Sequence, residues 1–218
     1  MKIYICACQF YHRIPGEKIA AVVATCRESG AICEIVPDLC FASAKNSPIL
    51  KNLNSQDVVL ACQPRAVRAL LGNAPELNCI DLRTEPLGKI FAKLNLAPVE
   101  KAEPATFDEQ KSNWIPWFPV IDSDRCINCK KCVDFCMFGV YTVESDRVRV
   151  VHPESCKTDC PACARICPQN AIIFPKSEDE KVNGSLLEQI KPSESDKTSF
   201  RERLQYRKKL RLFKEDKP

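Results

Sequence analysis

The sequence predicts an α/β protein: an N-terminal domain with a parallel sheet, a small cysteine-rich α+β domain and a C-terminal helical tail. Two observations lead to this fold class. Short apolar runs alternate with stretches of helical periodicity over residues 1–85, which is typical of a parallel sheet covered by helices. Beyond residue 119, two runs of four cysteines follow each other, and short β-prone segments flank each run.

Four segments of the N-terminal domain have the composition of buried strands. They are short, apolar and rich in β-branched residues, as expected of strands covered on both faces. The predicted strands cover residues 2–6, 31–36, 57–62 and 79–82.

Helical segments follow these strands. Residues 17–30 carry apolar side chains at helical spacing and end at a glycine, which is suited to a helix C-cap. Residues 47–53 and 64–72 each carry a proline at or near the first helical position. Proline is tolerated there because an N–H at that position has no acceptor within the helix. We expect a further helix within residues 85–97.

Composition divides the chain into four parts. Residues 86–119 form a helix and then a linker rich in proline and charge, and we expect Trp114 and Trp117 to pack this linker against the cysteine-rich domain. The four parts are an α/β domain (1–85), the helix and linker (86–119), the cysteine-rich domain (120–175), and a flexible segment with a basic helix (176–218).

Cysteine usage and the N-terminus predict a reducing compartment. The chain has 218 residues and 15 cysteines. Its first residues lack the apolar core and cleavage site of a signal peptide, and no run approaches the roughly 18 to 20 apolar residues that span a bilayer. We therefore expect a cytoplasmic protein without a membrane span, in which grouped cysteines bind metal. The formal net charge of +4 is too small to indicate nucleic-acid binding.

The two cysteine runs have the spacing of iron-sulfur ligands. A two-residue spacer lets a loop curl so that three thiolates bind three corners of a 4Fe-4S cube. Zinc is the alternative, although zinc sites favour separated Cys-x2-Cys pairs over runs of four. The runs are Cys126-x2-Cys129-x2-Cys132-x3-Cys136 and Cys156-x3-Cys160-x2-Cys163-x3-Cys167-Pro168.

The fourth cysteine of each run is expected to cross to the other cluster, as it does in two-cluster modules. This rule gives two ligand sets, which we call the first and second cysteine groups. The first cysteine group is Cys126, Cys129, Cys132 and Cys167. The second cysteine group is Cys136, Cys156, Cys160 and Cys163.

This pattern resembles the bacterial-type ferredoxins with two 4Fe-4S clusters, over about residues 118–176. The resemblance implies a small α+β fold and a role in electron transfer. The chain departs from the family in two places: the three-residue spacer between Cys156 and Cys160, and Met137 where the family has proline.

Seven cysteines lie in the N-terminal domain, and four of them lie at or shortly after the carboxyl ends of predicted strands. Because the carboxyl ends of parallel strands lie at one edge of a sheet, we expect these four to converge there. This N-terminal cysteine group is Cys6, Cys8, Cys40 and Cys62. The other three are expected to be small core residues: Cys26, Cys33 and Cys79.

A second resemblance concerns residues 1–85. The segments ICACQF, PDLC and VVLACQPR are similar to the N-terminal domain of the flavin-containing subunit of heterodisulfide reductase. The resemblance implies a third 4Fe-4S cluster, held by the N-terminal cysteine group. The alternative is a plain α/β domain with unligated thiols. The chain contains no flavin or nicotinamide motif, so flavin chemistry does not carry over.

The cysteine pattern and both resemblances predict an electron-transfer protein of anaerobic metabolism, either a subunit or a dedicated carrier. It would relay single electrons between a flavin, hydrogenase or heterodisulfide-reductase-like partner and an acceptor. The alternatives are an oxidoreductase with a catalytic cluster in the N-terminal domain and an iron-sulfur redox sensor. Because the chain lacks a nucleotide motif and an acid–base set, we favour a non-catalytic component of an oxidoreductase complex.

Residues 198–214 predict a basic C-terminal helix. Two interpretations stay open for this segment. The helix docks an acidic surface of a redox partner, or it packs lightly on its own protein.

Overall fold

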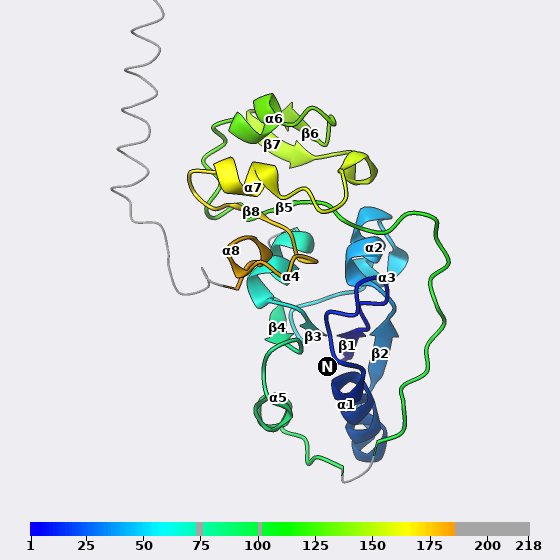
Figure 1. Cartoon of the computed structure of the whole chain (residues 1–218). Coiled ribbons are helices and arrows are strands. Elements are labelled where there is room, and N and C mark those ends of the chain that lie inside the picture. The colour runs from blue at the N-terminus through cyan, green and yellow to red at the C-terminus, as the bar shows by residue number, and fades with distance from the viewer. Residues whose placement is uncertain (73–75, 100–101, 186–218) are drawn as a thin grey trace, which may run out of the picture. The chain divides into compact units, whose positions relative to one another are not determined.

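The N-terminal domain is built on a parallel sheet of four strands (Figure 1). The computed structural model describes residues 1–72, 76–99 and 102–185. The strands lie in the order β2-β1-β3-β4, and every neighbouring pair is parallel, as the sequence predicts. Their bounds are β1 (Ile3–Cys6), β2 (Cys33–Val36), β3 (Val58–Ala61) and β4 (Asn78–Asp81).

Five helices connect or follow these strands in the described part of the domain. Four were expected, and Gly30 ends the first of them with φ 69°, the left-handed conformation that glycine adopts without strain. The unexpected helix is α2, which begins because the Asp38 carboxylate accepts a bond from the Phe41 N–H at 3.0 Å. The helices are α1 (Gly16–Ser29), α2 (Leu39–Ala44), α3 (Pro48–Lys51), α4 (Pro64–Leu70) and α5 (Leu87–Leu94).

The strand order creates a switch point beside β1. From β1 the chain moves to β2 on one side, and then returns past β1 to β3 on the other side. Connections that leave in opposite directions open a crevice at the carboxyl ends of β1 and β3. Sites in open α/β sheets form in such crevices.

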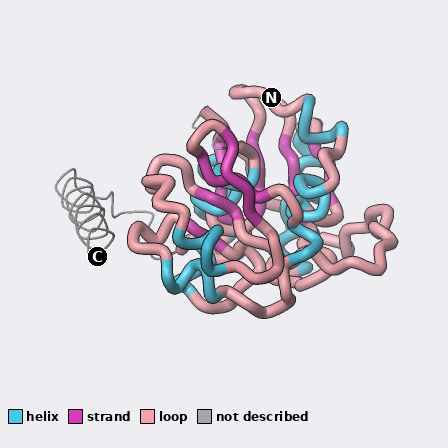
Figure 2. Tube along the Cα trace, turned by 90° about the horizontal axis from the view of Figure 1, so that it is seen from above, coloured by secondary structure: helices cyan, strands magenta, loops and turns pink. Residues whose placement is uncertain are grey.

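The cysteine-rich domain contains two short antiparallel pairs, β5 with β8 and β6 with β7. Figure 2 shows that loops make up much of the chain between its short elements. The elements are β5 (Val120–Ile121), α6 (Lys131–Phe135), β6 (Tyr141–Glu144), β7 (Arg147–Val150), η1 (Pro153–Ser155), α7 (Ala162–Ile166), β8 (Ile172–Ile173) and α8 (Glu180–Asn183).

The two domains share an apolar core. Phe118, Val120 and Ile173 are buried in the same cluster of side chains as the sheet of the N-terminal domain. Trp117 packs on the cysteine-rich domain as expected, with its ring 5.4 Å from that of Phe174. Trp114 does not: its ring lies 5.9 Å from that of Phe41 in α2, so it packs on the N-terminal domain instead.

The chain after β8 also packs on the N-terminal domain. Lys176 is 3% exposed, and its carbonyl accepts a bond from Arg13 Nε at 3.0 Å. The polar composition of this segment does not predict such burial. The predicted basic helix over residues 198–214 lies outside the described residues, and among those described no helix has the length and apolarity needed to cross a membrane.

Candidate functional site

The N-terminal cysteine group lies together at the switch point of the sheet. Cys6 ends β1, Cys8 lies two residues later, Cys40 lies in α2, and Cys62 directly follows β3. Burial, together with the neighbouring Cys8, raises the pKa of Cys62 to about 12. Burial likewise raises the pKa of Cys40, to which Cys62 and Cys6 contribute. The four thiols are therefore electrostatic neighbours, brought together from three strand ends.

Backbone geometry fixes this arrangement. Cys8 has φ 50°, in the left-handed region that residues with a Cβ seldom adopt. The chain turns sharply there, and the Cys8 carbonyl accepts a bond from the His12 N–H at 2.7 Å. The Leu39 N–H, at the start of α2, donates to Cys6 Sγ at 3.4 Å. The turn and the helix thus hold two sulfurs of the group in place.

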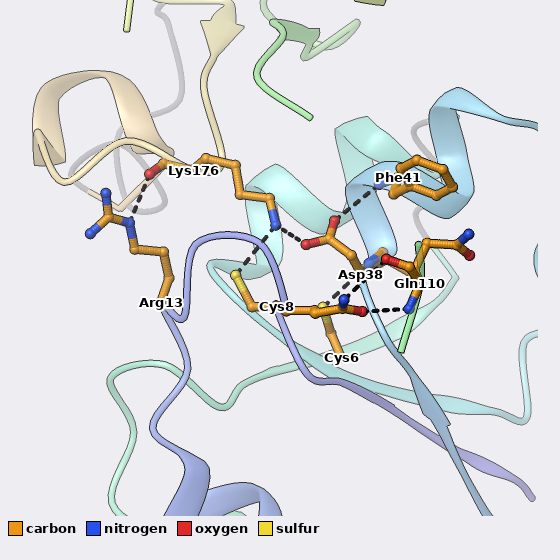
Figure 3. Close-up of polar contacts among 9 residues, drawn as sticks. Cys6, Cys8, Arg13, Asp38, Phe41, Gln110 and Lys176 are labelled. Carbon is orange, nitrogen blue, oxygen red and sulfur yellow. Dashed lines mark hydrogen bonds and ion pairs between the residues drawn. The ribbon is translucent and has the colours of Figure 1, made fainter. Parts of the chain in front are cut away.

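Two charged residues complete this site, and neither was predicted. Lys176 and Asp38 form a buried ion pair beside Cys8 (Figure 3). Burial alone lowers the pKa of Lys176, but Cys40 and Asp38 outweigh it, so the pKa lies well above its ordinary value. The ion pair with Asp38 and the contact with Cys8 place this ammonium group within the cysteine group.

The first cysteine group combines residues from both cysteine runs. Cys126 and Cys129 lie in the loop that leads into α6, and Cys132 lies in that helix. Cys167 directly follows α7. A cavity is lined by all four cysteines of the group. Burial, together with the neighbouring Cys126 and Cys167, raises the pKa of Cys132 to about 12. Cys167 thus lies with the cysteines of the other run, in the position expected of a crossing ligand.

Two left-handed residues shape the loop around this group. Asn128 and Lys130 have φ 52° and 63° and occupy the spacers between its three cysteines. Asparagine tolerates this conformation, and its side chain accepts a bond from the Val148 N–H at 3.0 Å. The loop can curl because these spacers reverse the chain direction locally.

The second cysteine group shows the reciprocal crossing. Burial raises the pKa of Cys156 to about 12, with contributions from Cys163, Cys136 and Cys160. Cys136, from the first run, therefore lies with the three cysteines of the second. Met137, at the position where the sequence departs from the ferredoxin pattern, is 86% exposed.

The donor sets fit 4Fe-4S clusters. Each group offers four thiol sulfurs. In each of the first and second cysteine groups one sulfur accepts a hydrogen bond, a contact that tunes cluster potential. The Ala171 N–H donates to Cys167 Sγ at 3.3 Å, and the Tyr141 hydroxyl donates to Cys163 Sγ at 3.1 Å. No three Cys, His, Asp or Glu side chains among the described residues converge closely enough for a single metal ion. A cube binds each thiolate at a different iron, so its ligands surround a larger volume.

Replacing Tyr141 with phenylalanine is expected to lower the reduction potential of the cluster that we expect the second cysteine group to bind. The hydroxyl is buried against Cys163 and stabilises negative charge on its sulfur, which is greater in the reduced state. The lost bond should also cost about 1 kcal/mol of stability. An EPR-monitored redox titration measures the potential.

The matched control for this prediction is Tyr4→Phe, which removes a hydroxyl from β1 in the N-terminal sheet. Iron content should stay unchanged in both variants, because neither removes a sulfur ligand. Equal potentials in Tyr141→Phe and the parent protein would show that the hydroxyl does not act on this cluster.

Comparison with known proteins concerns mainly the cysteine-rich domain. Residues 118–185 match the family described as a 4Fe-4S dicluster domain. The chain is 49% identical over 74 residues to an uncharacterized ferredoxin of Methanocaldococcus jannaschii. This match covers 34% of the chain and 48% of the relative, so the chain spans about half the length of that protein.

Two further relatives are matched over most of their own length. Ferredoxin-3 of a Nostoc species is 36% identical over an alignment of 78 residues. The match covers 27% of this chain and 79% of the relative. The pyruvate synthase subunit PorD of Methanothermobacter marburgensis is 32% identical over 87 residues, which are 40% of this chain and 98% of the relative.

Proposed function

The chain belongs to the family of 4Fe-4S dicluster ferredoxins and is an iron-sulfur electron-transfer carrier, and we propose that it relays single electrons through three clusters. The ferredoxin resemblance seen in the sequence is thereby confirmed. The observation that carries the finer proposal is the assembly of twelve cysteines into three groups of four. Bound clusters would supply one-electron chemistry, and the chain's residues would hold, bury and tune them.

Two of the clusters are assigned to the cysteine-rich domain. The first cysteine group would hold one and the second cysteine group the other, with Cys167 and Cys136 as the crossing ligands. The geometry supports this because each crossing cysteine is an electrostatic neighbour of the opposite run. Tyr141 and the Ala171 N–H would then tune the two clusters through their sulfurs.

The third cluster is assigned to the N-terminal cysteine group. Three observations support it: the resemblance to the heterodisulfide reductase domain, the convergence of four thiols at a switch point, and the buried lysine among them. Three clusters require about twelve irons per chain, and two require about eight. Cys40→Ala is therefore expected to reduce the iron content of anaerobically purified protein from about twelve to about eight.

Cys26→Ala is the matched control, since Cys26 lies in α1 outside all three groups. It should keep about twelve irons. A parent protein with about eight irons, unchanged by Cys40→Ala, would contradict the third cluster and leave the other two intact.

We propose further that the chain is a subunit of an oxidoreductase complex. Two relatives are named pyruvate synthase subunits, and the N-terminal resemblance favours a flavin-containing, heterodisulfide-reductase-like partner, with a hydrogenase as the other candidate. Anaerobic affinity purification of the full chain should co-purify a redox enzyme that reduces it. A chain that stays alone and reduces a small substrate by itself would instead favour the catalytic alternative.

A further inference from the structure

Lys176 belongs to the ferredoxin domain, by which we mean the matched residues 118–185, and it contacts the N-terminal cysteine group. Its Nζ donates to Cys8 Sγ at 3.3 Å and forms an ion pair with Asp38 (Figure 3). Lys176 and Asp38 are 3% and 2% exposed, and Cys8 is 4% exposed. An ammonium group is seldom buried to this extent without a specific partner, because desolvation costs several kcal/mol per ion.

The pair is held rigidly from both sides. Asp38 is fixed as the N-cap of α2, since its other carboxylate oxygen accepts from the Phe41 N–H at 3.0 Å. The backbone at Lys176 is held by Arg13 Nε, and the next carbonyl, of Ser177, accepts from an Arg83 guanidinium nitrogen at 3.2 Å. The ammonium group is therefore held between the Asp38 carboxylate and the sulfur of Cys8.

We propose that Lys176 is a positioning residue that raises the reduction potential of the third cluster, an inference that rests on the proposed binding of that cluster by the N-terminal cysteine group. Reduction adds one electron and one negative charge, with no bond formed or broken. A buried cation that donates to a ligand sulfur stabilises the more negative state more strongly than the oxidised one. The ferredoxin domain thus tunes a site in the N-terminal domain.

The experiment is a redox titration followed by EPR on the full-length protein, purified anaerobically. Lys176→Met should shift one of three potentials to a more negative value. We expect at least a tenfold change in the equilibrium constant, which is about 59 mV for one electron. The other two potentials should stay unchanged, and the iron content should remain about twelve. Lys176→Arg keeps the positive charge, so its potential should stay close to that of the parent protein.

A second variant guards against a folding defect. Lys176→Met alone leaves Asp38 buried and uncompensated, whereas Lys176→Met with Asp38→Asn removes both charges and keeps an N-cap residue. Because the loss of the Asp38 carboxylate opposes the loss of the ammonium group, the double variant tests whether the cluster is retained, and Lys176→Met tests the potential. Lys181→Met is the matched control, because Lys181 is exposed on α8.

The outcomes separate this inference from the proposed third cluster. If all three potentials of Lys176→Met match the parent at about twelve irons, Lys176 does not tune the cluster, although the cluster exists. If the double variant loses about four irons, Lys176 has a structural role instead, and the tuning inference is wrong. If the parent protein itself contains about eight irons, the assignment of a third cluster is wrong, and so is the inference about Lys176.

Discussion

Replacing Cys167 with alanine is expected to remove about four irons from the protein and to lower the melting temperature of the ferredoxin domain. Cys167 comes from the second cysteine run but lies with the cysteines of the first, so it would hold a cluster between the two halves. Without it, that cluster loses a ligand and the halves lose a link. Because metal-site binding contributes to folding, stability should fall with the iron content.

Iron analysis and thermal unfolding under anaerobic conditions measure both effects. Cys26→Ala is again the control, and its iron content should match the parent. Combining Cys167→Ala with Cys40→Ala should remove about eight irons, because the two residues serve separate clusters. Full iron content in Cys167→Ala would exclude the crossing arrangement.

Replacing Arg65 with alanine is expected to destabilise the protein by about 3 kcal/mol. Arg65, in α4, donates through Nε to the Asp122 carboxylate at 2.7 Å, and the two side chains are 10% and 11% exposed. A second guanidinium nitrogen donates to the Asn170 carbonyl. The substitution leaves the Asp122 carboxylate poorly compensated in a buried position. Arg125 still attracts it, which keeps the expected loss at the lower end of the range for such pairs.

Chemical unfolding followed by circular dichroism measures this loss. Arg65→Lys should be intermediate, because lysine keeps the charge but cannot donate in the forked geometry of a guanidinium group. Arg65→Ala with Asp122→Asn should recover part of the stability, since the uncompensated carboxylate is removed. A loss below about 0.5 kcal/mol for Arg65→Ala would place this pair with ordinary surface ion pairs.

The parallel sheet and the cysteine spacing were predictable because they depend on local pattern. β1 and β3 are continuous apolar runs, and Gly30 marks the end of α1. The spacing of the two cysteine runs predicts crossing ligand sets, and the structure brings the members of each set together. Ligation itself stays a prediction, to be tested by the iron counts above.

The buried ion pair was not predictable, because it depends on contacts between distant residues. Asp38 and Lys176 are separated by 138 positions, and each is polar in a segment that reads as exposed. The segment PDLCFASA is too short for a clear helical period, so α2 was missed although Asp38 is a typical N-cap residue. Trp114 was assigned to the wrong domain for a similar reason: its aromatic neighbour Phe41 lies in that same unpredicted helix.

The contact between Cys8 and Lys176 spans 168 positions, and this separation has a consequence for the order of assembly. During synthesis, the N-terminal cysteines leave the ribosome long before the residue that covers them. The contact of Lys176 with the N-terminal cysteine group therefore forms only after the cysteine-rich domain has been made. For the proposed third cluster, we expect iron and sulfide to be delivered in that interval, before Lys176 and Asp38 pair beside Cys8.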